Sequence, residues 1–366
     1  MKKTDKKSMI LLSLCTLGML LVLVGLYAIS PLNNREIYRG SFSRDFTPEN
    51  TIIQKAILDL GVNSYYISGL TEDEVYLSNY TAIRHLLRMN ISLKDTQHIQ
   101  LKIKGLDSVV RSQQFRTKIE PPYFYMAHGI APALLRGKVD QWEAHRFMPD
   151  SIYFTSAVPI DSNAFAVRYY SKTQDSYELG VETAESPYFR YNHNLLQKQA
   201  EGFFSVDGML HYSKDLDKII YLYKYRNEYM LMDKKLNLLK RYNTLDTISQ
   251  ANVQVKKVNS ENSFELTSQP ALTQRMSSVS GKYLYINSGV LAQNEDEDQF
   301  TKNSVVDVYD LTKGEYLLSF YLPPYKNKGI SDFKIINNKL ITIQDQYLIS
   351  YDILNSSLFQ NYTLNN

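Results

Sequence analysis

Cysteine is nearly absent from this sequence, since Cys15 is the single one among 366 residues. Because no cysteine follows it, the rest of the chain cannot form an internal disulfide and must be stabilised by packing. The lipid-modified cysteine of a lipoprotein follows a small residue, whereas Leu14 precedes Cys15 and apolar sequence continues beyond it. We therefore interpret Cys15 as a thiol that faces lipid.

The sequence also lacks an excess of charge of either sign. It contains 41 lysines and arginines against 38 aspartates and glutamates, and several of the lysines belong to the first residues of the chain. Proteins that bind nucleic acid need a basic surface, because contacts to phosphates dominate the affinity. The balance of charge therefore predicts no nucleic-acid partner.

Recognisable catalytic motifs are missing as well. The chain has no GxSxG, GxGxxG or GxxxxGK[ST] sequence, and no two of its histidines are spaced as in a helical zinc site. The sequence therefore assigns no catalytic residue and no metal ligand. The histidines are His85, His98, His128, His145, His193 and His211.

One long apolar run is present. Met9–Ser30 contains no charged residue, and at about 1.5 Å per helical residue it is long enough to span the roughly 30 Å hydrocarbon core of a bilayer. The lysines before it favour a cytoplasmic N-terminus. We expect residues 1–8 in the cytoplasm, one transmembrane helix over 9–30, and the remainder in the periplasm, attached to a bacterial inner membrane. The lysines are Lys2, Lys3, Lys6 and Lys7.

A cleaved signal peptide is the alternative reading of this run. Signal peptides have an apolar core of about 7–15 residues and a cleavage site between small residues. Here the apolar core is longer, and the one candidate site, Ala28 and Ser30, is followed directly by Pro31. The sequence favours a retained anchor.

The remainder of the chain reads as an all-β domain. Tyrosine is abundant, with 29 copies beside 15 phenylalanines, and aromatic side chains suit pleated strands. From residue 63 onward, short runs rich in Tyr, Ile, Val and Leu alternate with turns, about four strands per 45 residues, which is typical of a propeller blade. The clearest hairpins are Val305–Tyr309 with Glu315–Leu322 and a second one around the turn Asp233–Asn237.

This spacing predicts a β-propeller over residues 46–366. Dividing roughly 310 residues into blades of 45–50 gives six blades, with seven as the alternative. Residues 31–45 are expected to be a linker, and the sequence leaves open whether a short strand near Ile37–Phe42 closes the ring. Ile52–Leu60 fits either a helix or a strand with a bulge.

The segment DVYDLTKGEYLLSFYLP, followed by ISDFKIINNKLITI, resembles the six-bladed propellers of the TolB-like and NHL-like group. The earlier segments SYYISGL, EVYLSNY and PPYFYMAHGIAP are similar to anchored extracytoplasmic propellers of Bacteroidota. The resemblance implies the fold only, because such propellers include protein-binding scaffolds, ligand sensors, and hydrolases or lactonases with a metal in the channel. It leaves room for a divalent metal such as calcium in the central channel, although the sequence indicates no cofactor.

Four residues are candidates for ligand binding. His128 ends an aromatic strand between prolines, and either faces a funnel or bonds the turn backbone. His211 and Arg275 lie on expected inner strands, where each either faces the channel or has a structural partner. Trp142, the only tryptophan, marks a binding surface if exposed and ordinary core if buried.

The acidic run Asn294–Asp298 lacks the spacing of a calcium-binding loop and is expected to be solvated. With no catalytic set in view, we expect a membrane-tethered propeller that binds or scaffolds a protein or small ligand. Its expected partners are the membrane, through residues 9–30, and another membrane or periplasmic protein. The alternative is a metal-dependent hydrolase or lactonase centred on the channel. A sensor has less support, because residues 1–8 are too few for an output domain.

Overall fold

The computed structural model describes residues 3–29, 37–48, 51–105, 115–148, 152–200, 203–251, 253–258, 263–266 and 272–354. The chain divides into two compact units, residues 1–38 and 39–366. The first unit contains α1 (Lys3–Ile29), of which the stretch Lys6–Ala28 is long and apolar enough to cross a membrane, by length and composition. The single apolar helix predicted from the sequence is therefore present.

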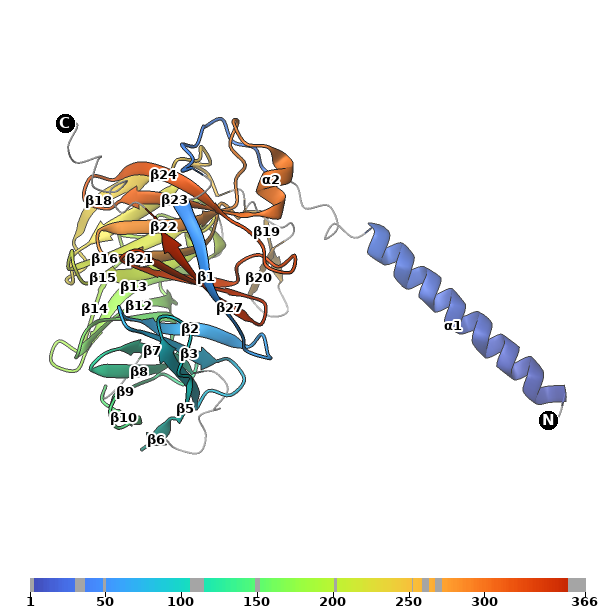
Figure 1. The fold of residues 1–366 in the computed structure, drawn as a ribbon, viewed down its shortest axis with the longest axis horizontal. Coiled ribbons are helices and arrows are strands. Elements are labelled where there is room, and N and C mark those ends of the chain that lie inside the picture. The colour runs from blue at the N-terminus through green and yellow to red at the C-terminus, as the bar shows by residue number, and fades with distance from the viewer. Residues whose placement is uncertain are drawn as a thin grey trace. The chain divides into compact units, whose positions relative to one another are not determined.

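The second unit is a six-bladed β-propeller (Figure 1). In each blade four antiparallel strands pair in sequence order, except where the ring closes, and blade 2 carries one additional strand. Most first strands contact the first strand of the next blade, so these strands line the centre of the ring. The structure confirms the all-β class and selects six blades over seven.

The blades are numbered here in chain order. Blade 1 contains β2 (Tyr65–Leu70), β3 (Glu74–Asn79), β4 (His85–Asn90) and β5 (Gln97–Gln100). Blade 2 contains β7 (Arg116–Glu120), β8 (Tyr123–His128), β9 (Ala133–Lys138) and β10 (Glu143–Arg146), with β6 (Lys102–Lys104) added in parallel to β10. Blade 3 contains β11 (Phe154–Asp161), β12 (Ala164–Ser171), β13 (Ser176–Thr183) and β14 (Phe189–Asn192).

Blade 4 contains β15 (Gly208–Ser213), β16 (Lys218–Tyr223), β17 (Glu228–Met232) and β18 (Leu238–Asn243). Blade 5 contains β21 (Gln274–Ser280), β22 (Tyr283–Ser288), β23 (Ser304–Asp310) and β24 (Glu315–Leu322). Blade 6 contains β25 (Asp332–Ile336), β26 (Lys339–Gln344), β27 (Tyr347–Ile353) and β1 (Ile52–Asp59). Outside the blades lie the hairpin β19 (Val255–Val258) and β20 (Ser263–Leu266), a 3₁₀ helix (Phe204–Val206) and α2 (Glu297–Lys302).

An apolar cluster lies between each pair of neighbouring blades. Blades 1 and 2, for example, pack Tyr76 against Phe124, and blades 4 and 5 pack Tyr229 against Tyr309. Further clusters join blades 2 and 3, 3 and 4, 5 and 6, and 6 and 1. Because both faces of a blade are covered, central strands such as β23 are buried along their whole length, including the polar residues Asp307 and Asp310.

The ring is closed by β1, which pairs antiparallel with β27 although the two strands lie at opposite ends of the propeller sequence (Figure 1). The pairing contains a bulge between Gln54 and Ala56, so of the two readings of this segment the bulged strand is correct. Ile37–Phe42, which the sequence leaves as a possible closing strand, does not pair with the last blade. In that segment only Arg39 forms a β-bridge, and its partner is Leu291 of blade 5.

Residues 39–47 form a strap along blade 5. Gly40 N–H donates to the Leu291 carbonyl and the Phe42 carbonyl accepts from Gln293 N–H, both at 2.8 Å. At the other end of the strap, Phe46 forms a parallel bridge with Ser319. The strap therefore fixes the chain to blade 5 before it enters blade 6.

Deleting residues 1–60 should remove the closing strand and leave the edge of β27 unpaired. Unpaired strand edges promote association, so we expect the 61–366 fragment to aggregate and to melt several degrees below a 39–366 fragment that keeps strap and β1. Light scattering behind size exclusion and a melting curve measure both properties. Two monomeric fragments with equal melting temperatures would contradict closure by β1.

Candidate functional site

A wide cavity opens at the centre of the propeller, and we call it the funnel. Its volume is about 880 Å³, and it lies at the C-terminal ends of the first strands β2, β7, β15, β21 and β25. Ligand cavities in proteins measure about 300–1,000 Å³, so the funnel has the size of a small-molecule site. Its polar lining includes Ser68, Lys118, Glu120, His211, Ser278 and Lys334.

A second cavity of about 130 Å³, the narrow cavity, adjoins the funnel. The two share Ser68, Lys118 and Lys334 as lining residues. Along β7 the funnel touches residues 118–121 and the narrow cavity touches 116–118, so the narrow cavity lies toward the start of the strand. The narrow cavity also reaches β11 of blade 3 through Ala157 and Pro159.

Three basic side chains come to the channel from alternate blades. Lys118 is on β7 of blade 2, His211 on β15 of blade 4 and Lys334 on β25 of blade 6. They are close enough to affect one another, because burial and the charges of Lys334 and Lys118 lower the pKa of His211 to about 3. Burial also lowers the pKa of Lys118, with a further lowering from Lys334 and an opposing effect of Glu120.

Two carboxylates lie beside these bases. Glu120 is shared, with its oxygens 3.3 Å from Lys118 Nζ and 3.0 Å from Lys214 Nζ. Asp332 accepts a hydrogen bond from Ile67 N–H at 2.8 Å, and burial raises its pKa against the opposing effect of Lys334. Glu120 thus forms ion pairs with two lysines, and Asp332 already accepts a hydrogen bond from the backbone of blade 1.

The structure places two of the predicted site residues on first strands. His211 lies in the funnel, and its Nε2 is 2.7 Å from Ser277 Oγ of β21. Arg275 is on β21 as expected, but its side chain is exposed and its guanidinium lies 5.6 Å from the ring centre of Phe300. The funnel therefore contains His211 among the residues that line it, and Arg275 is not one of them.

The other two predicted site residues lie in the core. His128 is 1% exposed, its Nδ1 accepts from Ala131 N–H at 2.9 Å, and its ring packs edge-on against Phe115. Trp142 packs between blades 1 and 2, against Tyr76 and Phe124. Of the two alternatives that the sequence left open for each residue, the structure shows the structural one: His128 bonds the turn backbone and Trp142 packs in the core.

Lys118 and Lys334 were missed by the sequence argument. Each is a single lysine near the middle of the first strand of a blade, in RTKIE and DFKII, where both of its neighbours are buried. His211 has the same kind of position in GMLHYS. A comparison of the first strands across blades would have revealed this shared basic position, whereas spacing along the chain does not.

The acidic run behaves differently from the solvated loop that the sequence predicts. Asp296 caps α2 by accepting from Gln299 N–H, and Glu295 is buried and bonded to Arg44. Glu295 is buried against its partner Arg44, which lies about 250 residues away in the sequence, and no local pattern predicts a contact over that separation. Among the described residues, no group of three or more His, Cys, Asp or Glu side chains is placed to hold a metal ion.

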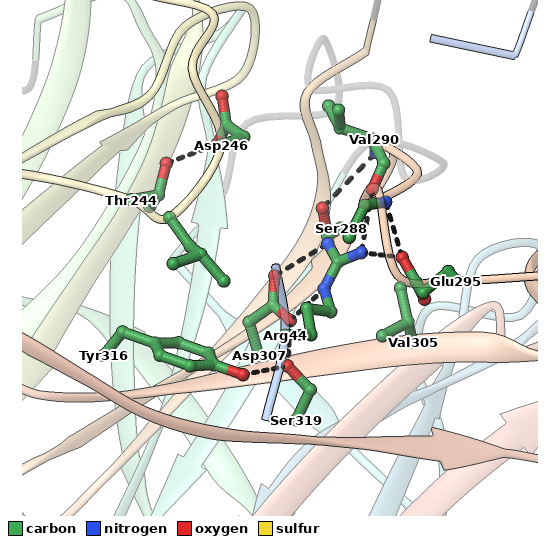
Figure 2. A network of polar contacts seen from close by, with 12 residues as sticks. Arg44, Thr244, Asp246, Ser288, Val290, Glu295, Val305, Asp307, Tyr316 and Ser319 are labelled. Carbon is green, nitrogen blue, oxygen red and sulfur yellow. Dashed lines mark hydrogen bonds and ion pairs between the residues drawn. The ribbon is translucent and has the colours of Figure 1, made fainter. Parts of the chain in front are cut away.

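The Arg44 network is the second polar centre of the propeller (Figure 2). The fully buried guanidinium donates to both oxygens of Asp307, at 2.7 and 3.1 Å, to the Val290 carbonyl and to Glu295. Glu295 also accepts from Tyr321 OH and Asp307 from Ser319 Oγ, both at 2.6 Å. Each guanidinium nitrogen has a partner within the protein, so the network fastens the strap to blade 5 and is not a ligand site.

Glu182 of β13 is a further buried carboxyl group, at 3% exposure. One of its oxygens accepts from Ile152 N–H at 2.6 Å. Burial raises the pKa of Glu182 to about 7, because the charged form loses its hydration. The folded state therefore holds a proton that the unfolded chain releases near pH 4.5.

Comparisons with known proteins support the fold and leave the activity open. No family model matches the chain, and no curated protein matches it. A solved protein from Bacteroides fragilis, described as exported, aligns over 86% of this chain and 98% of its own length, with 11% identity and a TM-score of 0.51. A DUF4221 family member from Bacteroides vulgatus aligns over 83% and 98%, with 12% identity and a TM-score of 0.49.

Virginiamycin B lyase from Staphylococcus aureus is also similar, with 9% identity and a TM-score of 0.47 over 82% of this chain and 99% of the lyase. Identities this low show the fold alone. The expected likeness to extracytoplasmic propellers of Bacteroidota is confirmed at the level of the fold. The narrower TolB-like grouping stays a prediction.

Replacing Arg44 with alanine should leave Glu295 and Asp307 buried without their cation. Breaking a buried ion pair in this way costs about 3–5 kcal/mol. Arg39→Ala is the matched control on the same strap, because its exposed pair with Glu297 contributes at most about 1 kcal/mol. Denaturant unfolding of both variants measures the difference, and equal free energies of unfolding would show that the Arg44 network does not anchor the strap.

Stability should fall as the pH rises from about 4.5 toward 7, because over this range the unfolded chain releases the Glu182 proton and the folded state still holds it. In Glu182→Gln, the decrease in the free energy of unfolding over this pH range should be smaller than in wild type by about 2 kcal/mol. Unfolding free energies at pH 5 and pH 8 test this, with the exposed Glu185→Gln as control. A parallel pH dependence in wild type and Glu182→Gln would count against the raised pKa.

Proposed function

We propose that this protein is a membrane-tethered binding protein that takes a small molecule into the funnel of its propeller. The observation that carries the proposal is the funnel itself, which gathers side chains from the first strands of five blades around about 880 Å³. Cavities of this size with a few convergent polar groups are the usual location of small-molecule sites. Tyr212, Tyr283 and Tyr285 add aromatic surface for the body of a ligand.

The rigidity of the ring supports binding at this place. The first strands are held by the six inter-blade clusters, so the side chains that line the funnel are positioned before a ligand arrives. A preorganised site loses less conformational entropy on binding than a flexible one. The funnel therefore has the construction of a binding site, and this requires no catalytic residue.

The anchor supports a location at a membrane. The apolar helix α1 is long enough to span a bilayer, and the lysines before it favour a cytoplasmic N-terminus. We place the propeller on the periplasmic side of a bacterial inner membrane. Tethering raises the effective concentration of the bound ligand near other membrane or periplasmic proteins, which we infer to be its partners.

The alternative, a metal-dependent hydrolase or lactonase, has less support. A divalent cation in the channel would lie beside Lys118 and Lys334, whose positive charges oppose its binding. Oxygen ligands are the ones that calcium and magnesium prefer. In the funnel, Glu120 is already shared by two lysines.

Filling the funnel should abolish binding. Ser280 lies in the funnel wall, and Ser280→Trp places a large side chain there, whereas Ser92→Trp makes the same change in an exposed turn of blade 1. We expect a thermal-shift screen of metabolites on the full-length protein in detergent to find compounds that raise the melting temperature of wild type and Ser92→Trp. The same compounds should not stabilise Ser280→Trp.

Two results of this screen would contradict the proposed function. One is that no compound stabilises the wild-type protein. The other is that the stabilising compounds act equally on Ser280→Trp, which would place their site outside the funnel.

A further inference from the structure

We propose that the ligand carries an oxyanion group, such as a phosphate, sulfate or carboxylate, and that Lys118, His211 and Lys334 hold it on the axis of the propeller. This inference rests on the proposed function, because it names the chemistry of a ligand in the same funnel. It goes further by assigning the residues that recognise the ligand. Cationic groups are the usual partners of carboxylate and phosphate oxygens in proteins.

The arrangement of the three bases carries the inference. They come from blades 2, 4 and 6, and the blades between them contribute smaller side chains to the same cavities: Ser68 from blade 1, Ala157 from blade 3 and Ser278 from blade 5. Long basic side chains thus alternate with short ones around the channel. Such a ring leaves space on the axis and directs donors at it from several sides, as an oxyanion with several acceptor oxygens requires.

The charges beside the cavities favour an anion. The described residues that line the narrow cavity include Arg116, Lys118 and Lys334 but no aspartate or glutamate. Of the nearby acids, Glu120 is shared by two lysines and Asp332 accepts from the backbone of Ile67. Glu72 and Asp215 also line the funnel, but both are exposed and lie beyond the ends of β2 and β15. Burial, together with the charge of Lys334, lowers the pKa of both Lys118 and His211, and an oxyanion between them would favour their protonated forms.

The sizes of the two cavities suggest how such a ligand lies. The narrow cavity, at about 130 Å³, is roughly four times the volume that one water molecule occupies in the liquid, about 30 Å³. It therefore has room for one oxyanion group between Lys118 and Lys334, with His211 on the funnel side, since His211 lines the funnel and not the narrow cavity. The funnel beyond it, with Tyr212 and Tyr283, has room for the body of an organic molecule.

Inorganic oxyanions at millimolar concentration test the inference on the full-length protein in detergent. Phosphate, sulfate and acetate are each compared with chloride at equal ionic strength, which separates tetrahedral oxyanions from carboxylates. We expect one or more of them to raise the melting temperature of the wild-type protein. Lys118→Gln and Lys334→Gln should each lower the affinity for the anion roughly tenfold or more, because each change removes a charged hydrogen-bond partner.

Lys172→Gln is the matched control, because Lys172 lies exposed in the hairpin between β12 and β13. Salts of this kind also stabilise proteins by exclusion from their surfaces, and that effect is the same in every variant. Lys334→Arg keeps the charge and should retain most of the response. Equal anion responses in wild type, Lys118→Gln and Lys334→Gln would overturn the inference.

A second measurement separates this inference from the proposed function. If a compound from the screen loses its binding in Ser280→Trp but keeps it in Lys118→Gln and Lys334→Gln, the funnel is a binding site and the oxyanion inference fails. If the binding survives all three changes, both fail.

Discussion

The apolar contact between neighbouring blades is the constraint on which this structure depends. A blade is a sheet with two apolar faces, so each blade needs a neighbour on both sides, and the requirement is met for all of them only when the ring closes. The ring is closed by β1, which lies at the start of the propeller sequence and pairs with β27 in the last blade. The strap and its Arg44 network fasten the chain just before that strand.

The closed ring explains how the channel can be basic. Lysines close to one another in a partly buried space oppose folding, because burial and like charge both disfavour their charged forms. The inter-blade clusters bury enough apolar surface to hold the first strands in place despite this opposition. Residues that weaken a fold and persist in a cavity are good candidates for a functional role, and Lys118 fits that description.

Much of the fold could be predicted from local pattern, and the site could not. The hairpin of β23 and β24 was predicted almost to the residue, because its strands are apolar and Gly314 has the positive φ that its turn needs. β1 was left undecided because it is a half-exposed rim strand with a bulge, which disturbs its alternation. Lys118 and Lys334 come from different blades, and Arg44 and Glu295 are far apart in the sequence. No spacing along the chain therefore predicts that the members of either pair lie close together.

The most direct test of a basic binding channel is the location of an oxyanion in a crystal. Crystals of the protein soaked in selenate, which replaces sulfate and scatters anomalously, would show where such a group binds. We predict an anomalous selenium peak on the propeller axis within hydrogen-bonding distance of Lys118 and Lys334, absent from crystals of Lys334→Gln. Selenate found only on the outer surface, with the channel empty at the same concentration, would contradict the account.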